Sequence, residues 1–536
     1  MSENPVDTPA LPAENSTAAK TFAYLMALTL FAVWFNLGGR PIETKDYMRY
    51  AEVGREILES GDWVIMHLNG EIYVDKPPLH FWLIAWSYKI FGVTPFAARL
   101  PSSLAAIGFV LLTFFFVQRR FGSTRMAFMA AVLLLSAYDF LWWARRTRLD
   151  MMFAFLFSAS LICFYCGSEE AARKRRVLWY LAFWFITGLA FMDKAFIALA
   201  NLVVVIPYSI MAARNPQGRK ISPGLFAAAS LCLLPAVLPW ILALVSHPEF
   251  SAYWKILGRT KIMDRHEAFY FYLVQMPLKL LPATPFFGMG IWIFFRHRRQ
   301  IVQRRELAFC LWWFASYLFI LHLTVAKNTR YLLPLYLPVA LVGAWAVQYA
   351  RDGRLQWFAP LLKRIDRLFF ICAALGLCGP LVYTYYWGVP PGAALLYTIA
   401  LGAALVLSRR FLPYRAAGLF VSAIILLVVI DVCDTVVKEK ASIYFRTNHL
   451  LQQQKLKPEQ VAFYKCPNRI QQAMSFYFNR VTSCSENWTA LASSPRVRAV
   501  VTTREALAAQ TSNQDKHNAG RIISVDKGWV IYIKPE

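Results

Sequence analysis

The sequence has few charged residues for its length, and acidic residues are the scarcer kind. Charged side chains make up only 16% of the 536 residues, against about a quarter in an ordinary soluble domain. Hydrophobic residues reach 58%, and the mean hydropathy is +0.41. This composition excludes an ordinary soluble enzyme and favours a polytopic membrane protein.

The net charge of +26 comes from 57 Lys and Arg against 31 Asp and Glu. Such an excess is also typical of nucleic-acid-binding proteins. Here the basic residues form short clusters between apolar segments, as they do in the cytoplasmic loops of membrane proteins. We therefore expect the bilayer, and no nucleic acid, as the partner of this charge.

Cysteine pairs suited to redox chemistry or zinc are lacking from the apolar part of the chain. Seven of the nine cysteines lie in or beside apolar segments, where a cysteine is usually a small buried hydrophobe. Cys163 and Cys166 have CxxC spacing, but within an apolar run. Cys466 and Cys484 lie in the polar C-terminal part, where a disulfide can form if that part is outside the cytoplasm. Free thiols are the open alternative.

The N-terminal segment lacks the features of a cleaved signal peptide. Only Lys20 is positively charged before the first apolar run, and no small-residue cleavage site follows that run. We expect residues 1–20 to form a disordered cytoplasmic tail and the apolar run to be retained as an anchor.

Long apolar runs dominate the remaining sequence. A helix needs about 20 apolar residues to cross a bilayer, and the sequence predicts about thirteen such spans. They are 22–39, 99–117, 126–143, 150–167, 178–193, 195–212, 223–245, 276–295, 307–325, 332–350, 368–387, 392–408 and 416–435. The pair 178–193 and 195–212 can also be one long helix. Residues 80–95 are apolar but contain ionisable side chains, and we predict a juxtamembrane helix there.

The basic clusters assign the two sides of the membrane. With the N-terminus inside, every even-numbered connection carries Lys or Arg, as at 173–176, which agrees with the positive-inside rule. An odd number of spans then places the C-terminus outside. The predicted fold class is an α-helical polytopic membrane domain, over 21–435, followed by an extracytoplasmic domain, over 436–536.

Residues 436–536 change in composition and are predicted to form a small α/β domain. Alternating runs at 497–503, 521–525 and 529–534 predict strands. The segments 470–478 and 503–510 predict short helices.

Ionisable residues are concentrated at 40–80, directly after the first span. Such groups are costly beside a bilayer unless they meet water, a partner or a substrate, so we predict an extracytoplasmic active-site loop here. Asp46 begins an amphipathic helix that runs to about Leu58 and has Tyr50 on its apolar face. Asp46 is either a helix cap paired with Arg49 or a functional carboxylate.

Three arginines, Arg145, Arg146 and Arg148, precede Asp150 at a predicted outside boundary, against the positive-inside trend. They bind anionic lipid headgroups or, in a cavity, a phosphate, to which the forked guanidinium is suited. Asp150 begins the next span and faces inward if it is functional.

Other outside boundaries add Lys194 and the pair Lys327 and Arg330. The last two stand where the next helix enters the membrane, a position that again suits a phosphate. His266, in another outside connection, can bind a divalent metal together with a carboxylate such as Asp75. A structural histidine is the more common alternative.

Several motifs together carry a resemblance to a known family. They are Asp46-x-x-Arg49-Tyr50-Ala51-Glu52, Gly61-Asp62-Trp63, His67-Leu68-Asn69-Gly70, Tyr73-x-Asp75-Lys76-Pro77-Pro78-Leu79, Ala98-Arg99-Leu100-Pro101-Ser102, Gly188-Leu189-Ala190-x-x-x-Lys194 and Arg330-Tyr331-Leu332-Leu333-Pro334-Leu335-Tyr336. In this combination the chain resembles the bacterial aminoarabinose transferases, which stand with the protein O-mannosyltransferases in the GT-C class of integral-membrane glycosyltransferases. The resemblance covers roughly residues 20–350.

The resemblance implies a GT-C fold and a sugar donor linked to undecaprenyl phosphate. It implies an enzyme of the bacterial inner membrane that acts at the periplasmic face on lipid A, a glycan or a protein. We expect the enzyme to be a monomer. We predict catalytic roles for Asp46 and Asp150, donor-phosphate binding by Lys76, Arg148, Lys194, Lys327, Arg330 and Tyr331, acceptor binding by Arg49 and Tyr50, and a divalent metal at Asp75 and His266.

Two positions depart from the family. Tyr47 and Asp75 each stand where the family often has Glu, and the shorter carboxylate at 75 weakens the metal assignment. The rival classes are a glycolipid transporter and a membrane scaffold that works through its C-terminal domain. The chain shows no internal repeat of the transporter kind, and its charges cluster on one side.

Overall fold

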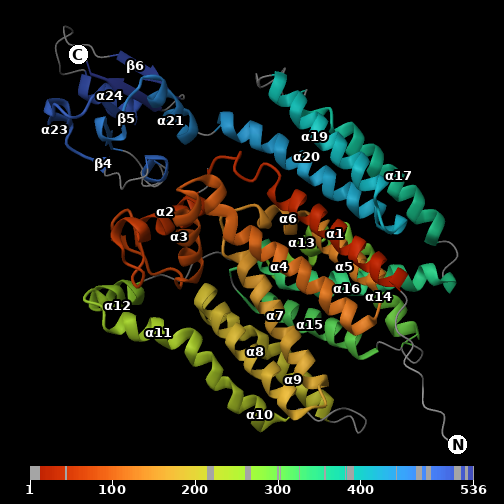
Figure 1. Cartoon of the computed structure of the whole chain (residues 1–536). Coiled ribbons are helices and arrows are strands. Elements are labelled where there is room, and N and C mark those ends of the chain that lie inside the picture. The colour runs from red at the N-terminus through yellow and green to blue at the C-terminus, as the bar shows by residue number, and fades with distance from the viewer. Residues whose placement is uncertain are drawn as a thin grey trace, which may run out of the picture.

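The computed structural model is a bundle of long helices with a small mixed domain at one end (Figure 1). It describes residues 12–42, 45–213, 222–259, 267–297, 301, 304–324, 326–354, 358–380, 382, 391–441, 443–465, 474–478, 484–511, 521–525 and 529–534. The architecture confirms the predicted class, a polytopic helical protein with a C-terminal α/β part.

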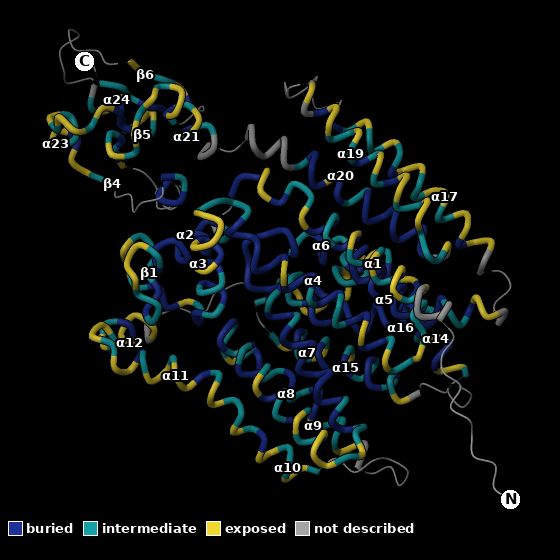
Figure 2. The backbone as a smooth tube through the Cα atoms, viewed as in Figure 1, coloured by how far each residue is buried: buried dark blue, intermediate teal, exposed yellow. Residues whose placement is uncertain are grey.

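Seven described segments are long and apolar enough to cross a bilayer, or up to nine if each of two bent pairs is one crossing. They contain α1 (Pro12–Trp34), α4 (Pro95–Phe121), α7 (Asp150–Glu169), α8 (Arg173–Lys194), η1 (Ala195–Ala200), α9 (Asn201–Ala213), α10 (Pro223–Ala228), η2 (Ala229–Leu233), α11 (Leu234–Val245), α15 (Arg304–Leu323), η3 (Thr329–Leu335), α16 (Tyr336–Tyr349) and η4 (Ala350–Arg354). The most completely buried of these, α4, α7 and α16, form the centre of the bundle (Figure 2).

The predicted pair of spans 178–193 and 195–212 folds as two helices separated by a turn, with the intervening η1 packed on α8. By composition alone, α8, η1 and α9 form one apolar run of 39 residues. Asn201 Nδ2, however, donates to Thr187 Oγ1 at 2.8 Å, although residues 14 positions apart lie about 21 Å apart on a straight helix. The chain therefore turns back, and Ala195 with its φ of 57° marks the turn.

Three more long helices, α17 (Phe358–Gly376), α19 (Pro391–Arg410) and α20 (Gly418–Ala441), pack against one another (Figure 1). These three helices lie outside the seven to nine segments named above, and part of each falls outside the described residues. With them and the turn at Ala195, the described helices follow the thirteen predicted spans in chain order.

Two predicted spans, 126–143 and 276–295, are wrong as straight helices. The first is α5 (Thr124–Leu135) and α6 (Tyr138–Ala144), bent by 72°, and the second is α13 (Phe271–Lys279) and α14 (Ala283–His297), bent by 107°. Ser136 Oγ donates to Leu133 O (2.9 Å) at the first bend, a local bond that competes with helix continuation. Pro282 lacks an N–H at the second.

The predicted disordered tail is wrong from Pro12 onward, because α1 begins there. A proline fits the first turn of a helix, where its missing N–H has no intrahelical partner to lose. Residues 1–11 lie outside the described residues.

The predicted active-site loop contains α2 (Lys45–Ser60), the strands β1 (His67–Leu68) and β2 (Glu71–Ile72), and the start of α3 (Leu79–Phe91). The amphipathic helix is confirmed, with Tyr50 and Ile57 buried on its inner face. α3 confirms the predicted helix, and with 13 residues it is too short to cross a bilayer. A Cβ added at Gly54 would collide with Ile84 Cγ2, so a glycine allows α2 to approach α3 closely.

The β1–β2 hairpin is tied to α2 by one carboxylate. Asn69 and Gly70 both have positive φ, 55° and 78°, as the two central residues of a tight hairpin turn require. The Glu56 carboxylate accepts from both of their backbone N–H groups, at 2.9 Å for Gly70. The predicted turn at these residues is confirmed, and it has a fixed position on α2.

The C-terminal domain is a five-stranded mixed sheet with helices, as predicted. Its strands are β3 (Val461–Tyr464), β4 (Cys484–Ser485), β5 (Ala499–Thr503), β6 (Arg521–Ser524) and β7 (Trp529–Ile533), in the order β4-β3-β5-β7-β6, and its helical elements are α21 (Ile443–Gln453), η6 (Pro458–Gln460), a turn of helix at 474–478, α23 (Trp488–Ser493) and α24 (Arg504–Thr511). β5 pairs parallel with β3 and antiparallel with β7, with Val501 opposite Ile531. Cys484 is disulfide-bonded, and Cys466 lies outside the described residues. The predicted boundary after residue 435 falls inside α20.

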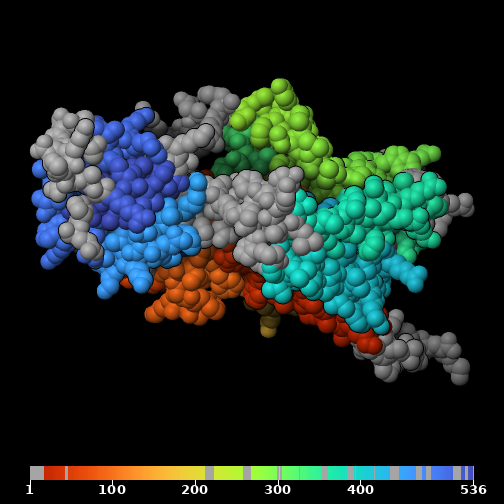
Figure 3. All heavy atoms as spheres, turned by 90° about the horizontal axis from the view of Figure 1, so that it is seen from above, coloured from red at the N-terminus to blue at the C-terminus, as the bar shows by residue number. Residues whose placement is uncertain are grey.

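This domain lies beside the active-site loop (Figure 3). Tyr477 contacts the backbone of Ile42, accepting from its N–H at 3.2 Å. Phe476 is buried in the same apolar cluster as α2 and α3, 6.5 Å from the ring of Tyr88. The loop is therefore packed on one side by the C-terminal domain and on the other by the membrane helices.

Asp431 of α20 gathers three arginines at the edge of the helix bundle. It accepts from Arg145 Nε at 2.9 Å and Arg146 Nη2 at 2.8 Å, and Arg40 Nη1 lies 3.6 Å away. Arg145 also donates to the carbonyl of Ala32 near the end of α1. Arg145 and Arg146 thus bind protein groups, not the headgroups or phosphate considered from the sequence.

We expect the substitution Asp431→Asn to destabilise the fold by about 3–5 kcal/mol, because it leaves buried guanidinium charges uncompensated. The midpoint of thermal unfolding of the purified protein in detergent measures this. Asp352→Asn, at an exposed acid of η4, is the control and should leave the midpoint unchanged. Equal midpoints for both variants would contradict a stabilising role for the ionic group around Asp431.

Candidate active site

Five ionisable side chains from four parts of the chain meet at one end of the helix bundle. Asp46 belongs to α2, Arg148 and Asp150 to the connection into α7, Lys194 to the end of α8 and Arg330 to η3. All five were predicted site residues. Because α7 and η3 begin where α8 ends, the structure places them together at the same end of these helices, as the side assignment requires.

Asp150 is the buried centre of this ionic group. Its side chain is 1% exposed and accepts from Lys194 Nζ at 2.6 Å and from Arg148 Nε at 3.0 Å, while Arg330 Nε lies 3.4 Å away. It also stands in the first turn of α7, where the helix dipole stabilises a negative charge. One carboxylate thus holds three cations in fixed positions.

Asp46 is the accessible carboxylate of the group. Arg148 Nη1 donates to it at 2.6 Å, and Arg49 Nη2 lies 3.9 Å away, yet the side chain remains 43% exposed. Burial alone would raise the pKa of Asp46, but the Arg148 guanidinium lowers it below its ordinary value of 3.8. Asp46 is therefore held ionised and can accept a hydrogen bond from an incoming group.

Arg148 bridges the two carboxylates and is itself enclosed by aromatic rings. Its guanidinium lies 5.5 Å from the ring centre of Tyr50 and 5.8 Å from that of Trp143, distances at which a cation is attracted to a ring face. Burial raises the pKa of Tyr50 to about 12. Tyr50, predicted to bind an acceptor, is only 5% exposed and supports Arg148 instead.

Tyr331 and Lys76 complete the cationic side. The Tyr331 ring lies 4.7 Å from Lys194 Nζ and 5.3 Å from the guanidinium of Arg330. Burial and the nearby charge of Lys194 lower the pKa of Lys76, so the two ammonium groups repel each other. An anion placed beside them would relieve this repulsion.

Lys327 is the predicted phosphate ligand that the structure does not bring into the group. Its Nζ donates to Thr324 O at 2.7 Å, and its side chain ties down the backbone before η3. Sequence position cannot separate Lys327 from Arg330, because both stand at the same boundary.

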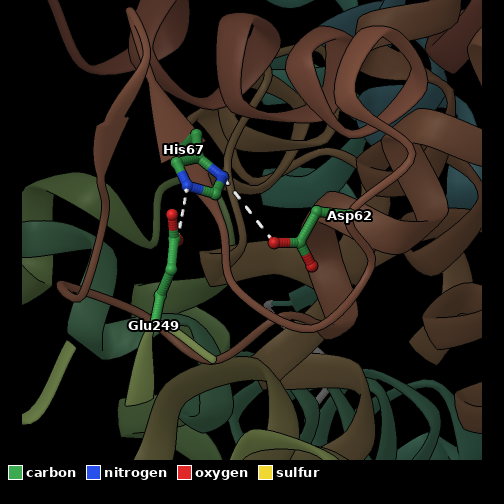
Figure 4. Close-up of side chains that lie close together, drawn as sticks. All are labelled: Asp62, His67 and Glu249. Atoms are coloured by element: carbon green, nitrogen blue, oxygen red, sulfur yellow. Dashed lines mark hydrogen bonds and ion pairs between the residues drawn. The ribbon is translucent and has the colours of Figure 1, made fainter. Parts of the chain in front are cut away.

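The predicted metal site at Asp75 and His266 receives no support. Asp75 Oδ2 accepts from Arg49 Nη1 at 3.0 Å, so its partner is a cation, and Arg49 is occupied by acids instead of facing outward. His266 lies outside the described residues. Among the described side chains, a group with metal-ligand spacing occurs elsewhere, at Asp62, His67 and Glu249 (Figure 4). Glu249 lies 182 positions from His67, so this group could not be recognised from the spacing of residues in the sequence.

Solved structures share the overall fold of this chain. ArnT from Cupriavidus metallidurans bound to undecaprenyl phosphate superposes with a TM-score of 0.71 at 22% sequence identity, over 95% of this chain and 97% of that one. Its apo state gives the same TM-score at 20% identity. The chain has the ArnT fold.

Sequence comparisons agree with the resemblance predicted from the motifs. The family described as dolichyl-phosphate-mannose-protein mannosyltransferase matches residues 75–242. The undecaprenyl phosphate-alpha-4-amino-4-deoxy-L-arabinose arabinosyl transferases of Aeromonas salmonicida and Yersinia enterocolitica are each 31% identical to this chain, over 61% and 66% of it. The matched part spans 61% and 64% of those relatives, or about three fifths of their length.

We expect Arg148→Gln to raise the pKa of Asp46, because the largest stabilising charge is lost. In the wild type, the contribution of this pair to stability is present above pH 3.8 and is lost as the pH falls through the lower folded value. Carbodiimide labels only the protonated carboxyl, so the pH midpoint of Asp46 labelling, read by mass spectrometry, should move upward in the variant.

Arg49→Gln provides the matched comparison, because its guanidinium lies 3.9 Å from Asp46 instead of 2.6 Å. It should shift the labelling midpoint less than Arg148→Gln does. A larger shift for Arg49→Gln would show that Arg49, and not Arg148, has the larger effect on the pKa of Asp46.

Proposed function

We propose that this protein is a glycosyltransferase that moves a sugar from an undecaprenyl-phosphate-linked donor to a lipid A-type acceptor. The observation that carries this proposal is the buried Asp150, which holds three cations beside an accessible, ionised Asp46. The similarity to arabinosyl transferases supports 4-amino-4-deoxy-L-arabinose, a pentose, as the sugar. The bacterial inner membrane is the location, with the site facing the periplasm.

The cationic side of the group receives the donor phosphate. Lys194, Arg330 and Lys76 outnumber the acids that they contact, and Asp150 fixes two of them. As the bond between the anomeric carbon and the phosphate oxygen breaks, negative charge grows on the phosphate. Cations that are already oriented stabilise this charge with little reorganisation. Tyr331 packs against both Lys194 and Arg330 and limits their movement.

Asp46 acts on the acceptor. If the attacking group is a hydroxyl, Asp46 accepts its proton as the oxygen bonds to the anomeric carbon. If the attacking group is a phosphate of lipid A, no base is needed and Asp46 positions the acceptor. In either case a single displacement inverts the anomeric centre. Arg148 holds Asp46 in the charged state that both roles need.

A protein acceptor is the second candidate, because the match to protein mannosyltransferases covers residues 75–242. That segment contains Asp150 and Lys194, which serve the donor, but not Asp46, which serves the acceptor. The donor half of the proposal is therefore common to both candidates. Mass spectra of lipid A and of membrane proteins, with and without expression of the chain, distinguish them.

A glycolipid transporter is the rival from a different class. The ionic group lies at one end of the helices, whereas transporter sites lie near the middle of the bilayer. Sugar transfer by the purified protein in detergent, which has no second compartment, would exclude transport as the whole activity.

Asp46→Asn should lower the turnover of sugar transfer by about 10²–10⁴-fold if Asp46 is the base, and less if it only positions a phosphate acceptor. Transfer from a polyprenyl-phosphate sugar to lipid A by purified protein measures this. Glu59→Gln, at an exposed acid of the same helix, is the control. Turnover close to that of the wild type would remove Asp46 from the reaction.

Lys194→Met should raise the KM for the donor by about 10- to 100-fold, because a charge-assisted bond to phosphate contributes about 1.5–3 kcal/mol. Lys327→Met is the matched control, since that buried lysine binds a backbone carbonyl. An equal effect of the two substitutions would mean that loss of a buried ammonium, and not loss of phosphate binding, causes the change.

A further inference from the structure

A histidine stands between two carboxylates on the β1–β2 side of the active-site loop (Figure 4). His67 Nε2 lies 3.2 Å from Glu249 Oε2, and its Nδ1 lies 4.0 Å from Asp62 Oδ2. One potential ligand atom from each of the three residues lies within 4.8 Å of the others. None of the three has a place in the proposed sugar transfer.

The backbone around the cluster is fixed. Asp62 Oδ1 accepts from the N–H groups of Val64 and Ile65, at 2.8 and 3.0 Å. The other oxygen, Oδ2, lies near His67 and His247. His67 is paired with Ile72 in the hairpin. Trp240 Nε1 donates to Val64 O at 3.0 Å and joins this turn to α11.

His247 lies beside the Asp62 carboxylate. Its Nδ1 accepts from the backbone N–H of Glu249 at 3.2 Å, so in the neutral ring the proton lies on Nε2. That Nε2 is 3.3 Å from Asp62 Oδ2. Metal-binding carboxylates commonly have a polar neighbour of this kind.

His67 makes one close contact with a carboxylate, through Nε2, and its Nδ1 lies 4.0 Å from the other, beyond hydrogen-bond distance. A neutral imidazole can donate from only one nitrogen, yet both of its nitrogens face carboxylate oxygens. A cation between the three residues would offset the charge of the two carboxylates. Imidazole nitrogens and carboxylate oxygens are both zinc ligands.

We propose that Asp62, His67 and Glu249 form a zinc site that joins the active-site loop to the turn between α11 and α12 (Phe250–Arg259). Tetrahedral ligands at about 2.0–2.2 Å from zinc lie roughly 3.4 Å apart. The pair of His67 and Glu249 already has this spacing. The side chain of Glu249 is 48% exposed and can rotate to complete the set.

Such a site has a consequence for the loop. Hairpin β1–β2 leads within four residues to Lys76. α11 and the segment after it also contact the loop through the small apolar cluster of Ile65, Val74, Leu244 and Tyr253. A metal would hold these two segments together at the water-exposed side of that cluster. The site is independent of sugar transfer, so the failure of one proposal leaves the other standing.

Zinc titration of the intact, chelator-stripped protein in detergent, against a colorimetric zinc chelator, tests the proposal. The wild type should bind about one equivalent. His67→Ala should abolish this binding, and Glu249→Gln, an isosteric change at an exposed residue, should weaken it by at least about 10- to 100-fold. Elution as the wild-type species in size-exclusion chromatography confirms that the variants are folded.

Two further variants define the position of the ion. Asp75→Asn should keep the zinc, because that residue belongs to a different predicted metal site. His449→Ala with Glu459→Gln removes an exposed histidine and acid in the C-terminal domain and should also keep it. The proposal is overturned if the wild type binds no more zinc than His67→Ala, or if Asp75→Asn loses the ion while Glu249→Gln retains it.

Discussion

The rest of the site depends on the bridge that Arg148 makes between Asp46 and Asp150. One guanidinium donates Nη1 to the first acid and Nε to the second, at 2.6 and 3.0 Å. Asp46 lies on an amphipathic helix outside the bundle, and Asp150 begins a central helix of it. A fork with fixed donor directions therefore sets the position of α2 relative to α7, and with it the distance from the accessible acid to the cations held by Asp150.

Burying so many charges in an apolar bundle is tolerated only if each has partners. The fold meets this condition with two separate ionic groups, one around Asp150 and one around Asp431. The second has three arginines for its central acid and lies between α1, α6 and α20, where it stabilises the scaffold. The first also has an excess of positive charge, but its acid Asp46 and its lysine Lys76 are not fully enclosed. The exposure of Asp46 and Lys76, more than the number of charges, distinguishes the candidate active site from the structural ionic group around Asp431.

The members of the site could be predicted from the sequence, but their pairing could not. Ionisable residues stand out in an apolar chain, and the distribution of arginine and lysine placed Asp150, Lys194 and Arg330 on one side. Within the run from Arg145 to Arg148, nothing local shows which guanidinium turns toward Asp150. That choice depends on Asp431, 285 positions beyond Arg146. The bends in two predicted spans could not be predicted either, because the hydropathy of a segment does not report a local break in its helix.

The active-site loop is held before any substrate arrives. Tyr477 of the C-terminal domain contacts its first residues, Arg148 holds Asp46, Glu56 fixes the hairpin turn, and Trp240 holds the turn after α2. Ordering a loop on binding would cost conformational entropy and lower affinity. Here the loop is already ordered by the protein's own contacts when the chain folds, so binding a ligand does not have to order it. Asp75 and Lys76 lie between two anchored segments, the hairpin and α3, so their positions follow from the fold and not from the ligand.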